Sequence, residues 1–226
     1  CFIQYHLHLQ LKEAVDYAHK KGVVIKGDIP IGIYRYGCDA WVEPELYNMD
    51  WQAGAPPDDF AAVGQNWGFP TYNWKRMQED GFAWWKQRFE QMSAYFDAFR
   101  IDHILGFFRI WSIPAHSIQG IMGHFVPCLP VHINEFGENG IWFDQQRYCK
   151  PFIIDEILYD LFGEQAGYVK ETFLVPNEFG SYDLSPDYRT QVQIEACFSS
   201  MEQNPENERI KLGLFDLTSN VLLFEE

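Results

Sequence analysis

The chain has few basic residues and few cysteines, and both shortages narrow the functions open to it. Its 17 lysines and arginines face 32 acidic residues, a formal charge of −15, whereas a nucleic-acid partner requires clustered positive charge. The five cysteines are scattered and show no CxxC spacing, so we predict neither a disulfide framework nor a zinc site. No apolar run approaches the roughly 20 residues of a membrane span. These absences favour a cytoplasmic protein with a neutral or cationic ligand, no metal, no nucleic-acid partner and no membrane partner.

The chain is also short for a complete barrel enzyme. Its 226 residues with 47% apolar content suffice for one core, but a closed (β/α)8 barrel typically takes about 250 residues. It begins with Cys1 rather than Met, and the segment from Asn220 to Phe224 reads as a strand cut short. We therefore expect a single domain that is incomplete at both ends.

Aromatic residues, in contrast, are abundant. They make up 17% of the chain, and seven of the eight tryptophans lie between Trp41 and Trp111. Flat rings with polar edges suit stacking on the faces of sugar rings, although any single ring is more simply a core residue. The density of rings, rather than any one of them, favours a carbohydrate ligand.

Hydrophobic periodicity predicts alternating helices and strands in the first half. A helix over 7–21 precedes a β-branched strand over 23–25, and a helix over 80–99 leads into a second strand over 99–102. A Gly-, Pro- and Trp-rich loop over 34–74 separates the two pairs, and a loop this long in a compact domain is usually functional. This order is typical of α/β folds with parallel strands. The core face of the second helix is predicted to carry Trp85, Phe89, Met92, Phe96 and Phe99.

The second half gives weaker signals. Helices are predicted over 153–162 and from the Ser185-Pro186 pair to about Met201, followed by a polar break over 203–208. This half therefore reads as mostly helical.

Candidate chemistry starts at the ends of the two predicted strands. Arg100 and Asp102 lie two residues apart, so a strand would point both to one side, where the cation would lower the pKa of the carboxylate. An ionised, oriented aspartate is what a retaining glycosidase needs for attack on an anomeric carbon. Asp28 follows the other strand. A purely structural charge pair is the alternative interpretation of these residues.

A second group of candidates lies on the long loop. Asp58, Gln65 and Trp67 supply a carboxylate, an amide and an aromatic ring within ten residues. Ordinary turn chemistry is the alternative for Asp58, because Asp commonly follows Pro in turns.

Three strings give the sequence a resemblance to a known family. KGDIPIG (26–32), GAPPDDFAAVGQNWGFPTYNW (54–74) and FRIDHILGFFRIWSIPAH (99–116) resemble the 4-alpha-glucanotransferases, the amylomaltase or disproportionating-enzyme family, glycoside hydrolase family 77. Gly68-Phe69-Pro70 and the residues after His103 resemble the plant-type cytosolic subgroup and its bacterial relatives. That subgroup carries an insertion after its nucleophile strand.

The resemblance implies a fold and a set of residue roles. The fold would be part of a (β/α)8 TIM barrel, about strands 3 to 4 with the long loop after strand 3, over residues 1–116, and a mostly helical insertion over 117–226. The substrate would be an α-1,4-glucan or maltooligosaccharide, with no cofactor. The implied catalytic residues are the nucleophile Asp102 and its partner Arg100, and the implied substrate-binding residues are His103, Asp58, Gln65, Trp67 and Asp28.

One family feature has no match. The acid/base glutamate motif is absent, because Glu135, Glu138 and Glu178 lie in Gly-containing turns and none follows a predicted barrel strand. We expect that glutamate beyond residue 226 and the isolated chain to be inactive. The alternatives are a non-catalytic glucan-binding fragment and an α-glucan hydrolase.

Overall fold

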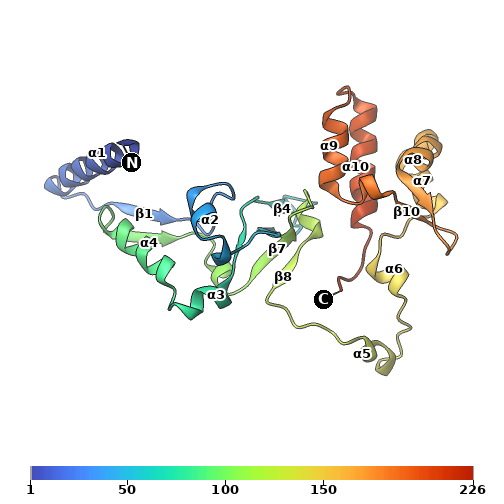
Figure 1. Cartoon of the computed structure of the whole chain (residues 1–226), viewed down its shortest axis with the longest axis horizontal. Coiled ribbons are helices and arrows are strands. Elements are labelled where there is room, and N and C mark those ends of the chain that lie inside the picture. Colours follow the sequence, from blue (N-terminus) through green and yellow to red (C-terminus); the bar gives the residue numbers. More distant parts are fainter. Residues whose placement is uncertain (1, 226) are drawn as a thin grey trace. The chain divides into compact units, whose positions relative to one another are not determined.

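The chain forms two units, and each is discontinuous along the sequence (Figure 1). The computed structural model describes residues 2–225. One unit contains the residues up to Ala53 together with Trp67–Ser112, and the other contains Gly54–Asn66 and the residues from Ile113 onward. The chain passes between them within strands β3 (Trp51–Ala55) and β7 (Ile110–Pro114). The expected division at residue 116 into a catalytic domain and an insertion stays a prediction.

The first unit is built around a parallel pair of strands, as the order of elements predicted. Strand β1 pairs with β6 in the register Lys26↔Ala98 to Ile29↔Ile101. No closed barrel is formed by residues 2–225, in which β1 and β6 make a two-stranded sheet. The elements of this unit are α1 (Phe2–Lys20), β1 (Lys26–Ile29), α2 (Cys38–Val42), the 3₁₀ helix η1 (Pro44–Leu46), β2 (Tyr47–Asn48), β5 (Thr71–Tyr72), α3 (Trp74–Glu79), α4 (Ala83–Ser93), β6 (Ala98–Ile101) and the 3₁₀ helix η2 (Ile104–Phe107).

The first strand lies later than predicted. Residues 23–25 lie outside the sheet, and β1 begins at Lys26. At Gly27 of β1 a Cβ atom would lie 2.4 Å from the ring of Phe96. Only glycine lets that ring pack so close to the strand. Asp28 therefore lies within the strand rather than after it.

Helix α4 is shorter than the predicted 80–99. It starts after Gly81 and Phe82, both in the left-handed region with φ of 70° and 62°, and it ends at Ser93. Of the five residues predicted as its core face, Trp85 is buried and the others are partly buried. Phe96 and Phe99 lie beyond the helix, and the rings of Phe89 and Phe99 meet edge to face at 5.9 Å. The spacing of apolar residues that predicted a helix up to residue 99 therefore extends past the end of α4 into β6.

The long loop over 34–74 contains more regular structure than expected. Besides α2 and η1 it holds β2 and β5, which pair antiparallel with Tyr47 opposite Tyr72. Both tyrosines are buried, and their rings lie 5.6 Å apart. Burial is the main reason that the pKa of each phenol is raised above its usual value. Packing of these rings, not hydrophobic periodicity, gives this segment its structure.

The second unit contains more helix than strand. A four-stranded sheet has the order β4-β3-β7-β8, and its strands β3 and β7 begin in the first unit. The α-helices of the second unit follow this sheet in sequence. The elements are β4 (Gln65–Asn66), the 3₁₀ helix η3 (Gly120–Met122), β8 (His124–Val126), α5 (Ile133–Glu138), α6 (Gln145–Cys149), α7 (Asp155–Phe162), the 3₁₀ helix η4 (Gly163–Gln165), α8 (Ala166–Phe173), β9 (Leu174–Pro176), β10 (Tyr182–Leu184), the 3₁₀ helix η5 (Pro186–Tyr188), α9 (Gln191–Ser199) and α10 (Pro205–Ser219).

Helix boundaries in this unit differ from the prediction at three places. The Ser185-Pro186 pair opens only the short η5. Helix α9 starts at Gln191 and is capped by Thr190, whose side chain forms a reciprocal capping box with that of Gln193. The polar break over 203–208 contains the start of α10, capped by Asn204. Residues 220–225 form no strand. The polar segment over 203–208 is therefore the capped start of a helix rather than a break in structure.

The apolar core of the second unit lies among α7, α8, α9 and α10. Its fully buried members include Phe162, Phe173, Ile194 and Leu214. Helix α10 packs closely on α7 at Gly213, where a Cβ atom would lie 2.4 Å from the Phe162 ring. The four helices therefore form one packed group.

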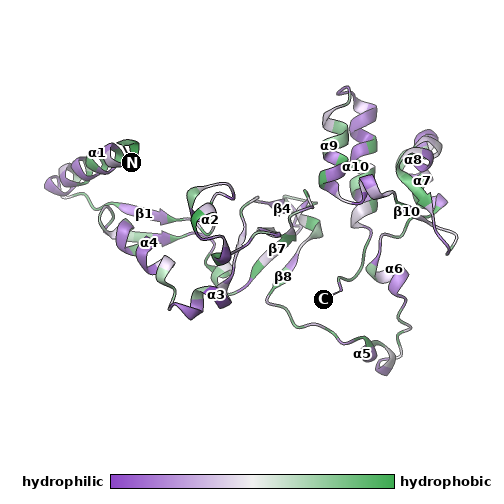
Figure 2. Cartoon of the chain, in the orientation of Figure 1, coloured by the Kyte–Doolittle hydropathy of each residue, from purple (hydrophilic) through white to green (hydrophobic). Residues whose placement is uncertain are grey.

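Helix α1 has a hydrophobic N-terminal half (Figure 2). Phe2, Ile3 and Tyr5 are exposed, whereas Val15 near the other end is buried. The C-terminal end is tied to the segment before β6 by His19 Nε2, which lies 2.9 Å from Asp97 Oδ2. Among the residues that the structure describes, no helix combines the length and apolar character needed to cross a membrane.

Candidate active site

An ion pair joins the two parallel strands on their exposed face. Asp28 of β1 and Arg100 of β6 are direct partners in the register. Arg100 Nε donates to Asp28 Oδ1 at 2.6 Å, and Nη2 donates to Oδ2 of the same carboxylate. The two parallel hydrogen bonds fix the orientation of the guanidinium plane relative to the carboxylate plane, because the two N–H groups are spaced to match the two carboxylate oxygens. The hydrogen bond and charge of Asp28 are the main reasons that the pKa of Arg100 is raised.

The position of Arg100 refines the role expected for it. Sequence spacing placed its cation directly beside Asp102, but both of the hydrogen bonds above go to Asp28. Asp102 contributes the weakest of the causes that raise the pKa of Arg100. Arg100 therefore acts first on Asp28, and its influence on Asp102 is a longer-range electrostatic one.

Asp102 follows directly after β6. Its backbone N–H donates to the carbonyl of Ile29 at 3.0 Å, which extends the parallel ladder by one residue. Its side chain is exposed and lines a cavity of about 390 Å³ together with Pro30–Arg35 and Trp67–Phe69. Both strands run into this cavity with their carboxyl ends, which is where parallel α/β folds carry their functional sites.

His103 and Trp67 form the aromatic part of the site. The His103 backbone is in the left-handed region at φ 48°, an uncommon conformation for a residue with a side chain that often accompanies function. Its ring meets the Trp67 ring edge to face with centroids 4.9 Å apart. Trp67 in turn stacks on Phe69 at 5.7 Å. The unit therefore brings together Asp28, Arg100, Asp102, His103 and Trp67.

Arg35 is a site residue that sequence reasoning missed. It lines the same cavity as Asp102, and its guanidinium donates to the carbonyls of Met49 at 2.5 Å, Trp51 at 2.6 Å and Gly68 at 3.2 Å. These bonds tie the loop after β1 to the segments around it. No spacing rule identifies such a residue, because its partners are backbone atoms that are distant in sequence.

Asp58 and Gln65, the other predicted substrate-binding residues, belong to the second unit. Asp58 Oδ1 accepts hydrogen bonds from the backbone N–H groups of Phe60 at 2.9 Å and Ala61 at 2.7 Å. This is the turn chemistry that was the alternative interpretation of Asp58, although one oxygen engaged in a turn leaves the other available. Gln65 lies on β4 opposite Ala55 of β3. The roles of both residues in substrate binding stay predictions.

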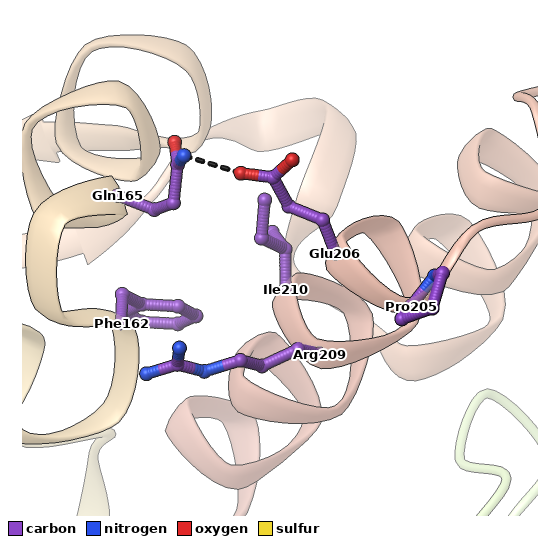
Figure 3. A pocket seen from close by; sticks show the side chains of 6 residues that line it. All are labelled: Phe162, Gln165, Pro205, Glu206, Arg209 and Ile210. Carbon is purple, nitrogen blue, oxygen red and sulfur yellow. Dashed lines mark hydrogen bonds between the residues drawn. The ribbon is translucent and has the colours of Figure 1, made fainter.

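The three glutamates considered as the acid lie in the second unit, and none of them follows β1 or β6. Glu135 and Glu138 lie on α5, where Glu135 Oε1 accepts from the His132 N–H at 2.9 Å as part of a helix cap, and Glu178 lies between β9 and β10. A hollow of about 350 Å³ beside α10 has an apolar floor, and Gln165 donates to its one carboxylate, Glu206 (Figure 3). Across residues 2–225, no group of three or more His, Cys, Asp or Glu side chains is arranged to hold a metal ion.

Gly32 is a position where backbone and aromatic ring nearly touch. A Cβ atom there would lie 2.2 Å from the Phe69 ring, which stacks on Trp67. We expect Gly32→Ala to displace Phe69, to lower the free energy of unfolding by about 1–3 kcal/mol and to weaken binding of the carbohydrate ligand that the sequence predicts. Urea unfolding and ligand titration measure the two effects. Gly167→Ala in α8 is the matched control, because a Cβ there has open space. Equal behaviour of the two variants would contradict the prediction.

The first unit is an α/β arrangement in which carboxylates and aromatic rings lie at the carboxyl ends of two parallel strands, the end at which α/β enzymes carry their functional sites. The model of the 4-alpha-glucanotransferase family, glycoside hydrolase family 77, matches residues 1–208. The chain therefore belongs to that family, as its three motifs predicted.

Curated relatives agree with this assignment, and a solved structure has a similar fold. The chain is 43% identical to 4-alpha-glucanotransferase DPE2 of Oryza sativa subsp. japonica, over 100% of the chain and 24% of that protein. It is 30% identical to 4-alpha-glucanotransferase of Aquifex aeolicus, over 83% of the chain and 39% of that protein. The fold is similar to amylomaltase from Streptococcus agalactiae, solved in complex with acarbose, with a TM-score of 0.52, 23% identity and coverage of 93% and 49%. The chain thus spans about a quarter to two fifths of these curated relatives.

Proposed function

We propose that the full-length protein containing this chain transfers α-1,4-glucan segments or glucosyl units from maltose or maltooligosaccharides to glucan acceptors. The observation that carries the proposal is the position of Asp102, at the carboxyl end of β6 in a cavity walled by Trp67 and Phe69. Support also comes from the Streptococcus agalactiae relative, which was solved with acarbose bound. A cytoplasmic location is part of the proposal and rests on the scattered cysteines.

In this mechanism Asp102 attacks the anomeric carbon and forms a covalent glycosyl-enzyme. A glutamate outside residues 1–226 protonates the leaving oxygen. A sugar hydroxyl then gives its proton to that glutamate and replaces Asp102 on the anomeric carbon, so that the configuration of the linkage is retained. His103 binds the sugar whose bond is cleaved, and Asp58, Gln65 and Trp67 bind donor and acceptor glucosyl units. Within this proposal, residues 1–116 belong to a (β/α)8 barrel and 117–226 to the subgroup's insertion. Residues 1–226 alone would then bind glucan without catalysis.

The products formed from maltotriose distinguish the proposed function from its alternatives. We expect the full-length protein, given maltotriose and a glucan acceptor, to release glucose and to lengthen other chains, because a sugar hydroxyl intercepts the intermediate. Chromatography of the products over time measures both. If reducing ends rise in step with bond cleavage and no longer chains form, the protein is a hydrolase. Retention of glucan without any conversion would instead indicate a binding protein.

A further inference from the structure

Two exposed tyrosines lie on the loop that follows β1, and the first of them also lines the cavity. The side chains of Tyr34 and Tyr36 are 73% and 80% exposed, and their rings meet edge to face with centroids 5.8 Å apart. Trp41 follows on α2 and is 84% exposed. Three exposed aromatic residues within eight positions form a local surface feature, which we call the Tyr34–Trp41 rim. Water is a poor partner for so much apolar ring surface, so such a concentration marks a binding surface.

The loop that carries these rings is anchored. Arg35, between the two tyrosines, donates to the carbonyls of Met49, Trp51 and Gly68. The Gly37 N–H donates to the Tyr34 carbonyl at 2.8 Å and closes a turn, and Ile33 and Ala40 on either side are buried. The rings are therefore presented by a backbone that is already ordered, which lowers the entropy lost when a ligand binds.

The rim adjoins the candidate active site. Tyr34 and Arg35 line the cavity that also holds Asp102. Tyr36 follows them on the same loop, and Trp41 follows on α2. A ligand that occupies the cavity and is longer than it can therefore extend over these rings. An uncharged ligand also suits a chain with a formal charge of −15, which repels anions.

We propose that the Tyr34–Trp41 rim is a remote glucosyl-binding site for long α-1,4-glucan chains. This inference rests on the proposed function and deepens it. The apolar faces of glucose units stack on the exposed rings, while their hydroxyl groups bond to the phenol oxygens and to water. Chains too short to reach beyond the cavity gain nothing from the rim. Its effect is therefore a preference for longer substrates.

The test compares a long and a short substrate on the full-length protein. Tyr36→Ala and Trp41→Ala, singly and together, should lower the ratio of kcat/KM for maltoheptaose to that for maltotriose, by about tenfold for the pair, since loss of well-placed aromatic anchors commonly costs this much. The loss should lie mainly in KM. Tyr159→Ala removes an equally exposed tyrosine of α7 and should leave the ratio unchanged.

Each other outcome has a defined meaning. An unchanged ratio in the double variant overturns the proposal, and so does an equal loss for both substrates. Failure of the variants to fold would show that other parts of the protein cover these rings, which also contradicts a glucan site. If the wild-type protein transfers no glucose, the proposed function fails on its own. Maltoheptaose affinity, measured by calorimetry on wild type and double variant, then still tests the rim.

Discussion

Asp102→Asn is expected to lower turnover of the full-length protein by at least about 10³-fold while glucan affinity stays close to that of the wild type. An amide is nearly isosteric with a carboxylate but cannot form the covalent intermediate. Because the side chain is exposed at the end of β6 and lines the cavity, the exchange should leave the fold intact. Initial rates with maltotriose and titration with maltoheptaose measure the two quantities.

Asp160→Asn makes the same chemical change at an exposed position of α7 and serves as the control. It should retain wild-type turnover. An Asp102→Asn protein that keeps more than about a tenth of the activity would move the nucleophile to another residue, since covalent catalysis does not tolerate such a loss lightly.

The second large effect is expected at the ion pair between the strands. Arg100→Lys keeps the charge but loses the fork that holds Asp28 through two bonds. We expect kcat to fall about 100-fold, because a small displacement of a catalytic group has a cost of this size. KM for maltotriose should change much less, since the groups that line the cavity remain in place.

A double-variant cycle decides how Arg100 acts. If Arg100 works through Asp28, then Asp28→Asn alone, Arg100→Lys alone and the two together should all lose a similar amount of kcat, which is strong non-additivity. An Asp28→Asn protein with near-wild-type turnover would instead mean that Arg100 acts on Asp102 directly, as its spacing in the sequence first suggested.

The sequence was informative where a local pattern decides the structure. The strand predicted over 99–102 differs from β6 (Ala98–Ile101) by one residue at each end. The three motifs predicted the family. The cross-strand partner of Arg100 could not be predicted in this way. That partner depends on the register of β1 against β6, which places Asp28 opposite Arg100, and register between strands that are distant in sequence cannot be read from a local pattern.

Asp58 shows a different limit of sequence reasoning. An aspartate after two prolines fits a turn and a sugar site equally well, and the structure shows the turn bonds. Arg35 shows a third limit, because its value to the site comes from carbonyls 14, 16 and 33 residues away. Such long-range backbone contacts carry no sequence signature.

The interleaving of the two units has a consequence for synthesis on the ribosome. Strand β3 and the segment up to Asn66 emerge before β7 (Ile110–Pro114), the strand that lies beside β3 in the sheet. At about 5–20 residues per second, the intervening stretch takes several seconds to translate. During that time one edge of β3 has its N–H and C=O groups open, and an open edge can pair with another chain. The nascent protein therefore exposes this strand edge while the stretch that carries Asp102 is still being translated.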